Sequence, residues 1–261
     1  MVFSINSTER LLSLFNSGQD LRSQSYRGRF APSPTGPLHL GNLRTALVSW
    51  LRARLNRGEW LLRIDDLDTL RNRGGAIETI QDDLLWLGLE WDGPIIFQSN
   101  RRALYRSVIS SLKLQNKIYP CRCTRRHLIH ANRSNKEFYV YPGTCRNLRL
   151  PWGIIDRRLP SLRLKVGENF SRLCGDVLLR RSDGFIAYHL ATVVDELVLG
   201  ITEVVRGQDL SQARNCHLAV TEALGQKPVN YRHAPLLYNP DGSKLSKREG
   251  SSGLKSLKNI G

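Results

Sequence analysis

The chain has 261 residues, of which 41% are hydrophobic, which is enough to bury the core of one domain carrying an insertion. No apolar stretch approaches the roughly 20 residues that a membrane-spanning helix needs, so no membrane partner is expected. The formal net charge of +16 and the pI near 10.1 favour a polyanionic partner such as nucleic acid, although basic surfaces also serve solubility.

Residues 1–25 contain several serines and no long apolar segment, and we expect a disordered N-terminal extension. The apolar side chains of residues 11–15 are able to form one helical turn. An organelle transit peptide is an alternative that Glu9 and Asp20 oppose, and an upstream start codon is another. Five cysteines without a secretion signal indicate a reducing compartment, so a cytoplasmic location is expected.

Hydrophobic periodicity from residue 27 onward predicts alternating strands and helices. This alternation is typical of an α/β fold with a Rossmann-type, doubly wound parallel sheet. Gly58 and Gly88 are expected to end the two helices. Ligands of such sheets bind outside the carboxyl ends of the strands, where Ser33 and Asp65 fall. The expected strands and helices, in chain order, are residues 27–31, 43–56, 60–64 and 76–87.

The later part of the chain breaks this rhythm and then resumes it. A segment rich in Arg, Pro and Cys reads as an insertion, alternation resumes at residues 184–191, and a helix over 213–224 precedes Gly225. The last residues are rich in Gly, Ser and Lys and are expected to be disordered. The expected divisions are 1–25 extension, 26–118 first half of the nucleotide-binding fold, 119–181 insertion, 182–250 second half, and 251–261 tail.

Two separated segments predict a site for a nucleoside triphosphate. The first, RFAPSPTGPLHLGN at residues 29–42, brings a Pro/Gly-rich loop and the His39 imidazole to the start of a helix. Unpaired N–H groups at a helix start suit a phosphate, and His39 adds a donor to a charge that grows during reaction. The second, KLSKR at residues 244–248, has two lysines able to hold a leaving pyrophosphate on a mobile loop. Alone, each segment also fits an ordinary connection or a solvated loop.

Three cysteines in the insertion have the spacing of a metal site. A C-x-C pair and a third thiolate after a Pro-Gly turn favour zinc, and the alternative is core packing of small apolar side chains. His127 and His130 are competing ligands, but their i, i+3 spacing favours a helix surface. Cys174 and Cys216 have no partner at metal spacing and are expected in the core. The group considered is Cys121, Cys123, Tyr141 and Cys145.

Arg29 and Asp65 are suited to a zwitterionic, acidic amino acid. Such a substrate needs a guanidinium for its side-chain carboxylate and an acceptor for its ammonium. Arg206 is a second guanidinium candidate and Tyr188 a phenol donor, and the alternative for each of these residues is a surface salt bridge. We find no nucleophile elbow and no P-loop, so neither covalent catalysis nor a P-loop fold is expected.

The two nucleotide segments together resemble the HIGH and KMSKS signatures of class I aminoacyl-tRNA synthetases. Residues 29–36 resemble the start of the glutamyl and glutaminyl branch, and the resemblance runs from Tyr26 to Arg248. It implies catalytic roles for His39 and Lys247 and a zinc-containing insertion. The implied glutamate-binding residues are Arg29, Phe30, Ala31, Pro32, Ser33, Asp65, Tyr188 and Arg206. The implied ATP-binding residues are His39, Gly41, Asn42, Lys244, Ser246 and Lys247. The implied zinc ligands are Cys121, Cys123, Tyr141 and Cys145.

The chain stops 13 residues after Arg248, where glutamyl-tRNA synthetases continue into an anticodon-binding region. A chain that has the activation segments but lacks the anticodon-binding region is similar to the glutamyl-queuosine tRNA(Asp) synthetases. The resemblance implies a monomer with one zinc ion that activates L-glutamate with ATP and Mg²⁺ and modifies tRNA(Asp) carrying queuosine. Asp65 departs from the family, which commonly has Glu at this position. A truncated glutamyl-tRNA synthetase and a non-catalytic RNA-binding paralogue are the alternatives.

Overall fold

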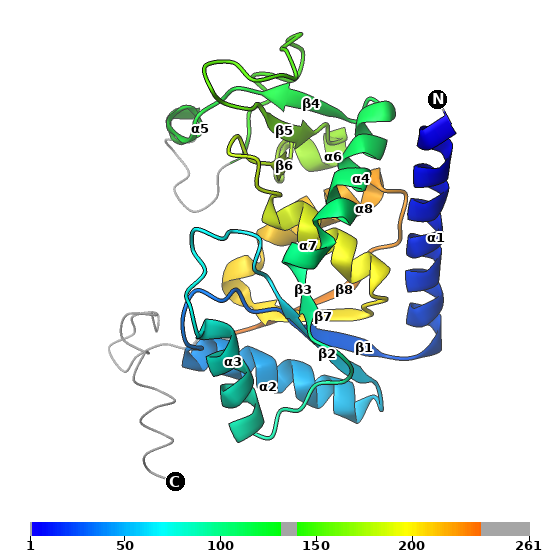
Figure 1. Cartoon of the computed structure of the whole chain (residues 1–261), viewed down its shortest axis with the longest axis vertical. Coiled ribbons are helices and arrows are strands. Elements are labelled where there is room, and N and C mark those ends of the chain that lie inside the picture. The colour runs from blue at the N-terminus through cyan, green and yellow to red at the C-terminus, as the bar shows by residue number, and fades with distance from the viewer. Residues whose placement is uncertain (1, 132–139, 236–261) are drawn as a thin grey trace. The chain divides into compact units, whose positions relative to one another are not determined.

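The computed structural model describes residues 2–131 and 140–235 (Figure 1), and they divide into two compact units. The first unit contains residues up to 19, 101–199 and 212–228. The second contains residues 20–100, 200–211 and those from 229 onward. Within the described part of the chain, no helix combines the length and the apolar character that crossing a membrane requires.

The second unit is built on parallel strands. β1, β2 and β3 form a parallel sheet in that order, and β7 and β8 form a parallel pair. β7 lies beside β1, because the Thr202 N–H just before β7 donates to the Arg27 carbonyl at 2.9 Å. The strands are β1 (Arg27–Phe30), β2 (Glu59–Ile64), β3 (Ile96–Phe97), β7 (Glu203–Gly207) and β8 (Asn230–Ala234). The expected α/β fold with a parallel sheet is therefore confirmed.

Helix α2 (Leu40–Leu55) packs against β1, β2 and β7, and α3 (Ala76–Trp86) contributes the side chains of Ile80 and Leu84 to the same core. Five of the six residues of β2 are buried, because packing covers both faces of this strand. The core is formed by Phe30, Leu38, Leu43, Ala46, Ala53, Trp60, Leu62, Ile64, Ile80, Leu84 and Leu89.

Both ends of α2 differ from the predicted helix over residues 43–56. The helix begins three residues earlier than expected, at Leu40, because His39 caps it. It ends at Leu55, and Arg57, with φ of 50°, makes the left-handed turn expected of Gly58. Gly88, with φ of 68°, follows α3 as predicted.

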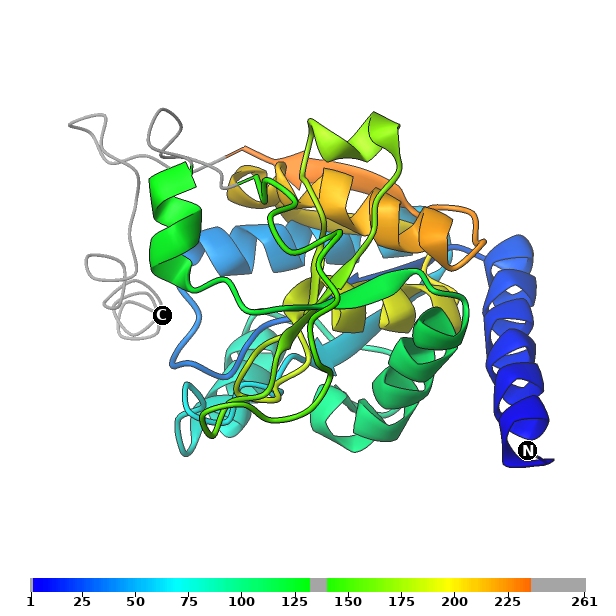
Figure 2. The same cartoon turned by 90° about the horizontal axis from the view of Figure 1, so that it is seen from above.

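The first unit contains an antiparallel sheet and its helices (Figure 2). β4, β5 and β6 pair in that order. Helices α7 and α8 pack on each other. The strands are β4 (Ile118–Cys121), β5 (Ser161–Leu164) and β6 (Leu178–Arg180). The helices are α4 (Arg102–Leu114), α5 (Arg125–Ala131), α6 (Glu168–Ser171), α7 (Tyr188–Val198) and α8 (Ala213–Ala223). Two 3₁₀ helices, Gln98–Arg101 and Gln208–Leu210, complete the elements.

The expectation of a disordered N-terminal extension is wrong for residues 2–24. They form helix α1 (Val2–Gln24), in which Leu11 and Phe15 are buried. These two side chains lie four residues apart on one helical face, so burying them offsets the entropy of ordering the segment. The apolar turn seen in the sequence is therefore a packing surface.

Candidate active site

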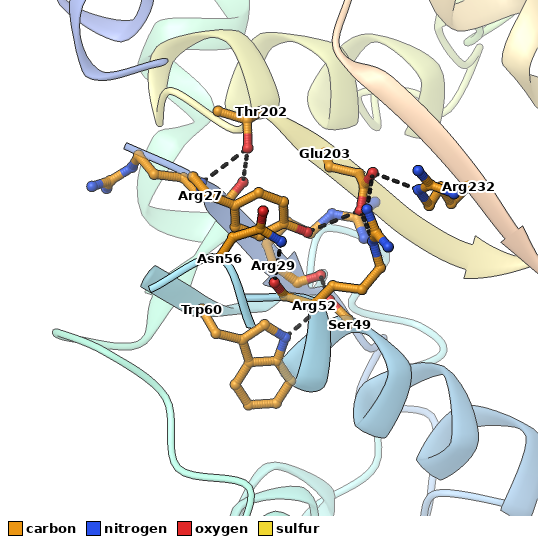
Figure 3. Close-up of polar contacts among 10 residues, drawn as sticks. Arg27, Arg29, Ser49, Arg52, Asn56, Trp60, Thr202, Glu203 and Arg232 are labelled. Carbon is orange, nitrogen blue, oxygen red and sulfur yellow. Dashed lines mark hydrogen bonds and ion pairs between the residues drawn. The ribbon is translucent and has the colours of Figure 1, made fainter. Parts of the chain in front are cut away.

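The residues after β1 are held against the end of β2. The Asp65 N–H donates to the Pro32 carbonyl at 2.9 Å, which joins the two carboxyl ends. The buried Ser49 hydroxyl donates to the Arg29 carbonyl at 3.1 Å and accepts from Trp60 Nε1 at 2.9 Å (Figure 3). This edge of the sheet is where a ligand of a parallel α/β sheet is expected, and the backbone that forms it is fixed by buried hydrogen bonds.

Both arginines proposed for a carboxylate substrate are buried in the second unit, so neither is the surface salt bridge that we weighed as an alternative. Arg29 is 5% exposed and its Nη1 donates to the Val205 carbonyl at 3.1 Å. Arg206 is 3% exposed and its Nε donates to His233 Nε2 at 3.2 Å. Burying a guanidinium is costly unless charge and hydrogen bonds compensate it, so two such residues are suited to binding an anion.

Asp65 has a partner that the sequence analysis missed. Arg63 Nε donates to one carboxylate oxygen of Asp65 at 2.6 Å and Nη2 donates to the other at 3.1 Å, and both side chains are buried. Residues i and i+2 of a strand point to the same face, and this spacing was the available signal. The two hydrogen bonds from Arg63 fix the plane of the Asp65 carboxylate.

His39 caps helix α2 through its side chain. Its Nδ1 accepts the Asn42 N–H at 3.2 Å, and the Asn42 side chain accepts the His39 N–H in return. An imidazole that accepts at Nδ1 carries its proton on Nε2 when neutral, so Nε2 is the nitrogen able to donate to a phosphate. Gly41 and Asn42 lie in the first turn of α2, where backbone N–H groups favour anions.

The remaining predicted residues fall in three places. Phe30 is buried and stacks on Trp60 with ring centroids 6.2 Å apart, while Ser33 is exposed beside Ala31 and Pro32. Tyr188 begins α7 in the first unit, 39% exposed, with its ring 5.3 Å from that of His217. Lys244, Ser246 and Lys247 lie outside the described residues.

The three insertion cysteines come together as one cluster. The sulfur atoms of Cys121, Cys123 and Cys145 lie within 4.8 Å of one another, with the Cys123 and Cys145 sulfurs 3.5 Å apart. The Tyr141 hydroxyl lies 3.3 Å from the Cys121 sulfur and accepts the Cys145 N–H at 2.9 Å. Gly175 backs onto Tyr141 with φ of 62°, and a Cβ there would clash with the Tyr141 backbone. Three converging thiols fit a thiophilic metal ion, so the cluster is a candidate metal site.

The environment shifts the pKa values of the cluster residues in different directions. Burial raises the pKa of Cys123 to about 11. Burial also acts to raise the pKa of Cys145, but hydrogen bonds from the Tyr141 hydroxyl and neighbouring groups outweigh it and the pKa is lowered. Burial, followed by the hydrogen bonds from the thiols, raises the pKa of Tyr141. The environment therefore lowers the pKa of Cys145 while it raises the pKa of Cys123 and of Tyr141.

The other candidate metal ligands are separate from this cluster. His127 and His130 are exposed on helix α5, as their spacing predicted. Cys174 and Cys216 are buried, as expected. A hydrogen bond between the two thiols, followed by burial, raises the pKa of Cys174, so these cysteines contact each other.

Comparison with known proteins identifies the family to which the chain belongs. The model of tRNA synthetases class I (E and Q), catalytic domain, matches residues 25–150 and 161–259. A glutamyl-Q tRNA(Asp) synthetase of Prochlorococcus marinus strain MIT 9313 is 63% identical over 244 residues, 94% of this chain and 80% of that protein. The protein of the same name from strain MIT 9303 is 60% identical over 261 residues, 100% of this chain and 85% of that protein. The chain belongs to the glutamyl-Q tRNA(Asp) synthetases.

A solved synthetase structure shows the same fold. The glutamate tRNA ligase from Elizabethkingia meningosepticum, in complex with its amino acid, superposes with a TM-score of 0.74 at 29% identity over 88% of this chain. The chain spans about half of that structure, 53% of its length. The family assignment inferred from the HIGH- and KMSKS-like segments is confirmed, and so is the expected fold of a class I synthetase.

A buried carboxylate ties the strands of this glutamyl-Q synthetase together. Glu203 on β7 accepts from Arg52 of α2, from Arg232 of β8 at 2.7 Å and from the Tyr26 hydroxyl at 3.0 Å (Figure 3). Burial acts to raise the pKa of Glu203, but the hydrogen bonds from Arg52, Arg232 and Tyr26 lower it below its ordinary value. The network joins α2, β7, β8 and the residue before β1, and so supports the strand that carries Arg206.

Proposed function

We propose that the chain activates glutamate with ATP and transfers it to the queuosine base in the anticodon of tRNA(Asp). The observation that carries the proposal is 60% identity over all 261 residues to a protein named glutamyl-Q tRNA(Asp) synthetase. The buried arginines and the helix-capping histidine support it, because an acidic amino acid and a triphosphate need such groups.

The proposed chemistry has two steps, activation of glutamate and its transfer to the tRNA. The α-carboxylate of glutamate attacks the α-phosphorus of ATP, the bond to the β-phosphate oxygen breaks, and pyrophosphate leaves. A hydroxyl of the queuosine cyclopentenediol then attacks the acyl carbon of glutamyl-adenylate, loses its proton, and AMP leaves. His39 Nε2 and Lys247 donate to the charged phosphate oxygens, and bound Mg²⁺ supplies further charge neutralisation there.

The glutamate-binding roles follow the charges of the substrate. We assign Arg29 and Arg206 to the side-chain carboxylate and Asp65 to the ammonium. Asp65 is one methylene shorter than glutamate, so a bridging water would complete its contact with the ammonium. Backbone groups of residues 30–33 line the same end of β1.

We propose that zinc is the metal of the cysteine cluster, one ion per chain, held by Cys121, Cys123 and Cys145 with Tyr141 as the fourth ligand. Zinc here is structural, because it cross-links the end of β4 to the segment that follows residue 140. The thiophilic donor set supports zinc over Mg²⁺ or Ca²⁺, which require oxygen ligands.

We propose that exposed arginines of the first unit bind the phosphates of tRNA(Asp). Internal contacts occupy several basic residues between positions 121 and 181, because Arg122 donates to backbone carbonyls, Arg146 pairs with Asp176, and Arg163 is buried. Affinity should fall steeply with salt, because each neutralised phosphate releases counterions. The exposed candidates are Arg125, Arg126, Arg149, Arg157, Arg158 and Arg172.

The test is transfer of labelled glutamate to matched samples of tRNA(Asp) with and without queuosine. We expect label only on the queuosine-containing tRNA. The label should persist after enzymatic trimming of the 3′-terminal adenosine, because the acceptor is the modified base. Enzymatic trimming is preferable to periodate, which also attacks the queuosine diol.

Loss of labelling after trimming would contradict the proposal and favour a glutamyl-tRNA synthetase that charges the 3′ end. Glutamate-dependent ATP–pyrophosphate exchange without tRNA is an independent test. Glutamyl-tRNA synthetases generally need tRNA to activate glutamate, so exchange in its absence would count against that alternative. No exchange and no transfer would favour a non-catalytic RNA-binding protein.

A further inference from the structure

Strand β8 brings two ring side chains next to Arg206. β7 and β8 are parallel, with Arg206 opposite His233 and Val204 opposite Tyr231. Because side chains alternate along a strand, Arg206, Tyr231 and His233 lie on one face of this pair. Arg232 lies on the other face, where its Nε donates to Glu203.

Two contacts define how the Arg206 guanidinium lies. Its Nε donates to His233 Nε2 at 3.2 Å, and its central carbon lies 4.7 Å from the centroid of the Tyr231 ring. One contact acts in the plane of the guanidinium and the other on its face, so together they restrict both rotation and tilt. Arg206 is 3% exposed, so little water competes with either contact.

The hydrogen bond also specifies the state of the imidazole. A guanidinium only donates, so His233 Nε2 must be the acceptor and must carry no proton. The neutral ring then has its proton on Nδ1. A protonated ring would present a second donor and a second positive charge to Arg206, which removes the contact.

We propose that His233 and Tyr231 are positioning residues that hold the guanidinium of Arg206 for the substrate carboxylate, with His233 in the neutral Nδ1–H form. The inference rests on the glutamate-binding role proposed for Arg206. An arginine side chain is long and flexible, so fixing its plane before glutamate arrives removes an ordering cost from binding. The effect is on glutamate affinity, and neither ring takes part in the chemistry.

The experiment compares His233→Leu with His233→Gln in glutamate-dependent ATP–pyrophosphate exchange by the full chain. Leucine removes the acceptor, whereas the glutamine side-chain oxygen is able to accept from Arg206 Nε. We expect His233→Leu to raise the KM for glutamate about tenfold or more, the scale of one hydrogen bond to a charged group, with a smaller change in kcat. His233→Gln should restore most of the affinity.

Asn230→Ala is the matched control, because it alters an exposed residue of β8 on the face opposite His233. Its KM for glutamate should stay within about twofold of the parent value. Equal defects in His233→Leu and His233→Gln, or an unchanged KM in His233→Leu, would overturn the inference. Circular dichroism of each variant separates misfolding from loss of positioning.

A second measurement does not depend on activity. Long-range ¹H–¹⁵N NMR of histidine-labelled protein should show His233 protonated at Nδ1 and bare at Nε2, with assignment by the His233→Gln variant. A proton on Nε2 would overturn the inference whatever the kinetics. Arg206→Ala separates the two proposals. An unchanged KM for glutamate in Arg206→Ala would refute the assigned role of Arg206 itself, whereas a raised KM there with an unchanged KM in His233→Leu would refute only the positioning.

Discussion

Replacing Glu203 by glutamine tests whether the buried network holds the parallel strands together. The side chain is 7% exposed and accepts hydrogen bonds from Arg52, Arg232 and Tyr26. Glutamine has nearly the same shape, but it loses the charge and turns an NH₂ group toward two guanidinium groups. The change therefore isolates electrostatics from packing.

The magnitude follows from the exposure of the partners. Removing one member of a fully buried ion pair costs about 3–5 kcal/mol, because the other charge is left uncompensated. Arg52 and Arg232 are 30% and 60% exposed, so water compensates part of that loss. We therefore expect Glu203→Gln to lower the free energy of unfolding by about 2–3 kcal/mol.

Glu59→Gln is the matched control, because Glu59 makes a comparable pair with Arg27 but is 48% exposed. Its cost should be below about 1 kcal/mol. The assay is urea unfolding at pH 7, followed by circular dichroism. Equal losses in Glu203→Gln and Glu59→Gln would refute the argument that burial makes the difference.

The network also predicts a pH window. The pKa of Glu203 is lowered from its ordinary 4.5, so its stabilisation is complete above that pH and is lost as the pH falls through the folded-state pKa. Burial, followed by the charge of Glu203, raises the pKa of Tyr26 from 10.0 to about 12, so its contribution is lost as the pH rises across that interval. The stability difference between parent and Glu203→Gln should therefore shrink in acid, and a constant difference down to pH 2 would contradict the ionised carboxylate.

Three further predictions concern separate features of the chain. Lys247→Ala should lower the rate of ATP–pyrophosphate exchange about 10²-fold, the scale of one transition-state charge contact, and parent-like turnover would leave the KLSKR segment an ordinary loop. Purified chain should contain one zinc by elemental analysis. Cys145→Ser should lose it while Cys174→Ser retains it, and zinc-free parent protein would leave the three cysteines as core packing. Gly18→Val should lower the free energy of unfolding by at least about 2 kcal/mol, because a Cβ there would overlap the Leu197 carbonyl on α7, and an unchanged urea midpoint would argue against this close approach.

Local patterns in the sequence were enough to predict several elements and the cysteine cluster. The apolar run at Trp60–Ile64 predicted a buried strand, since a strand covered on both faces needs no polar alternation. The C-x-C pair and Cys145 predicted a shared site because thiols at short spacing can reach one ion. The order and separation of the HIGH- and KMSKS-like segments pointed to the family.

Other features depended on residues far apart in the chain. The disorder expected at the N-terminus was wrong for residues 2–24, because the partner that covers Leu11 and Phe15 is not visible in the local sequence. Likewise, the left-handed turn after α2 falls at Arg57 rather than at the glycine that propensity favours. The intrinsic conformational preference of a residue predicts its conformation only weakly, because tertiary packing can override it.

By itself, the sequence determined which chemical groups are available, because residue types and their spacing are read directly from the chain. It predicted that Arg29, Asp65 and Arg206 are suited to an acidic amino acid. Only the tertiary structure decided how they are held, since Arg206 meets His233 from a strand 27 residues away and Asp65 meets Arg63. Such pairings follow from strand register and burial, which arise when the whole unit folds, and no local pattern specifies them.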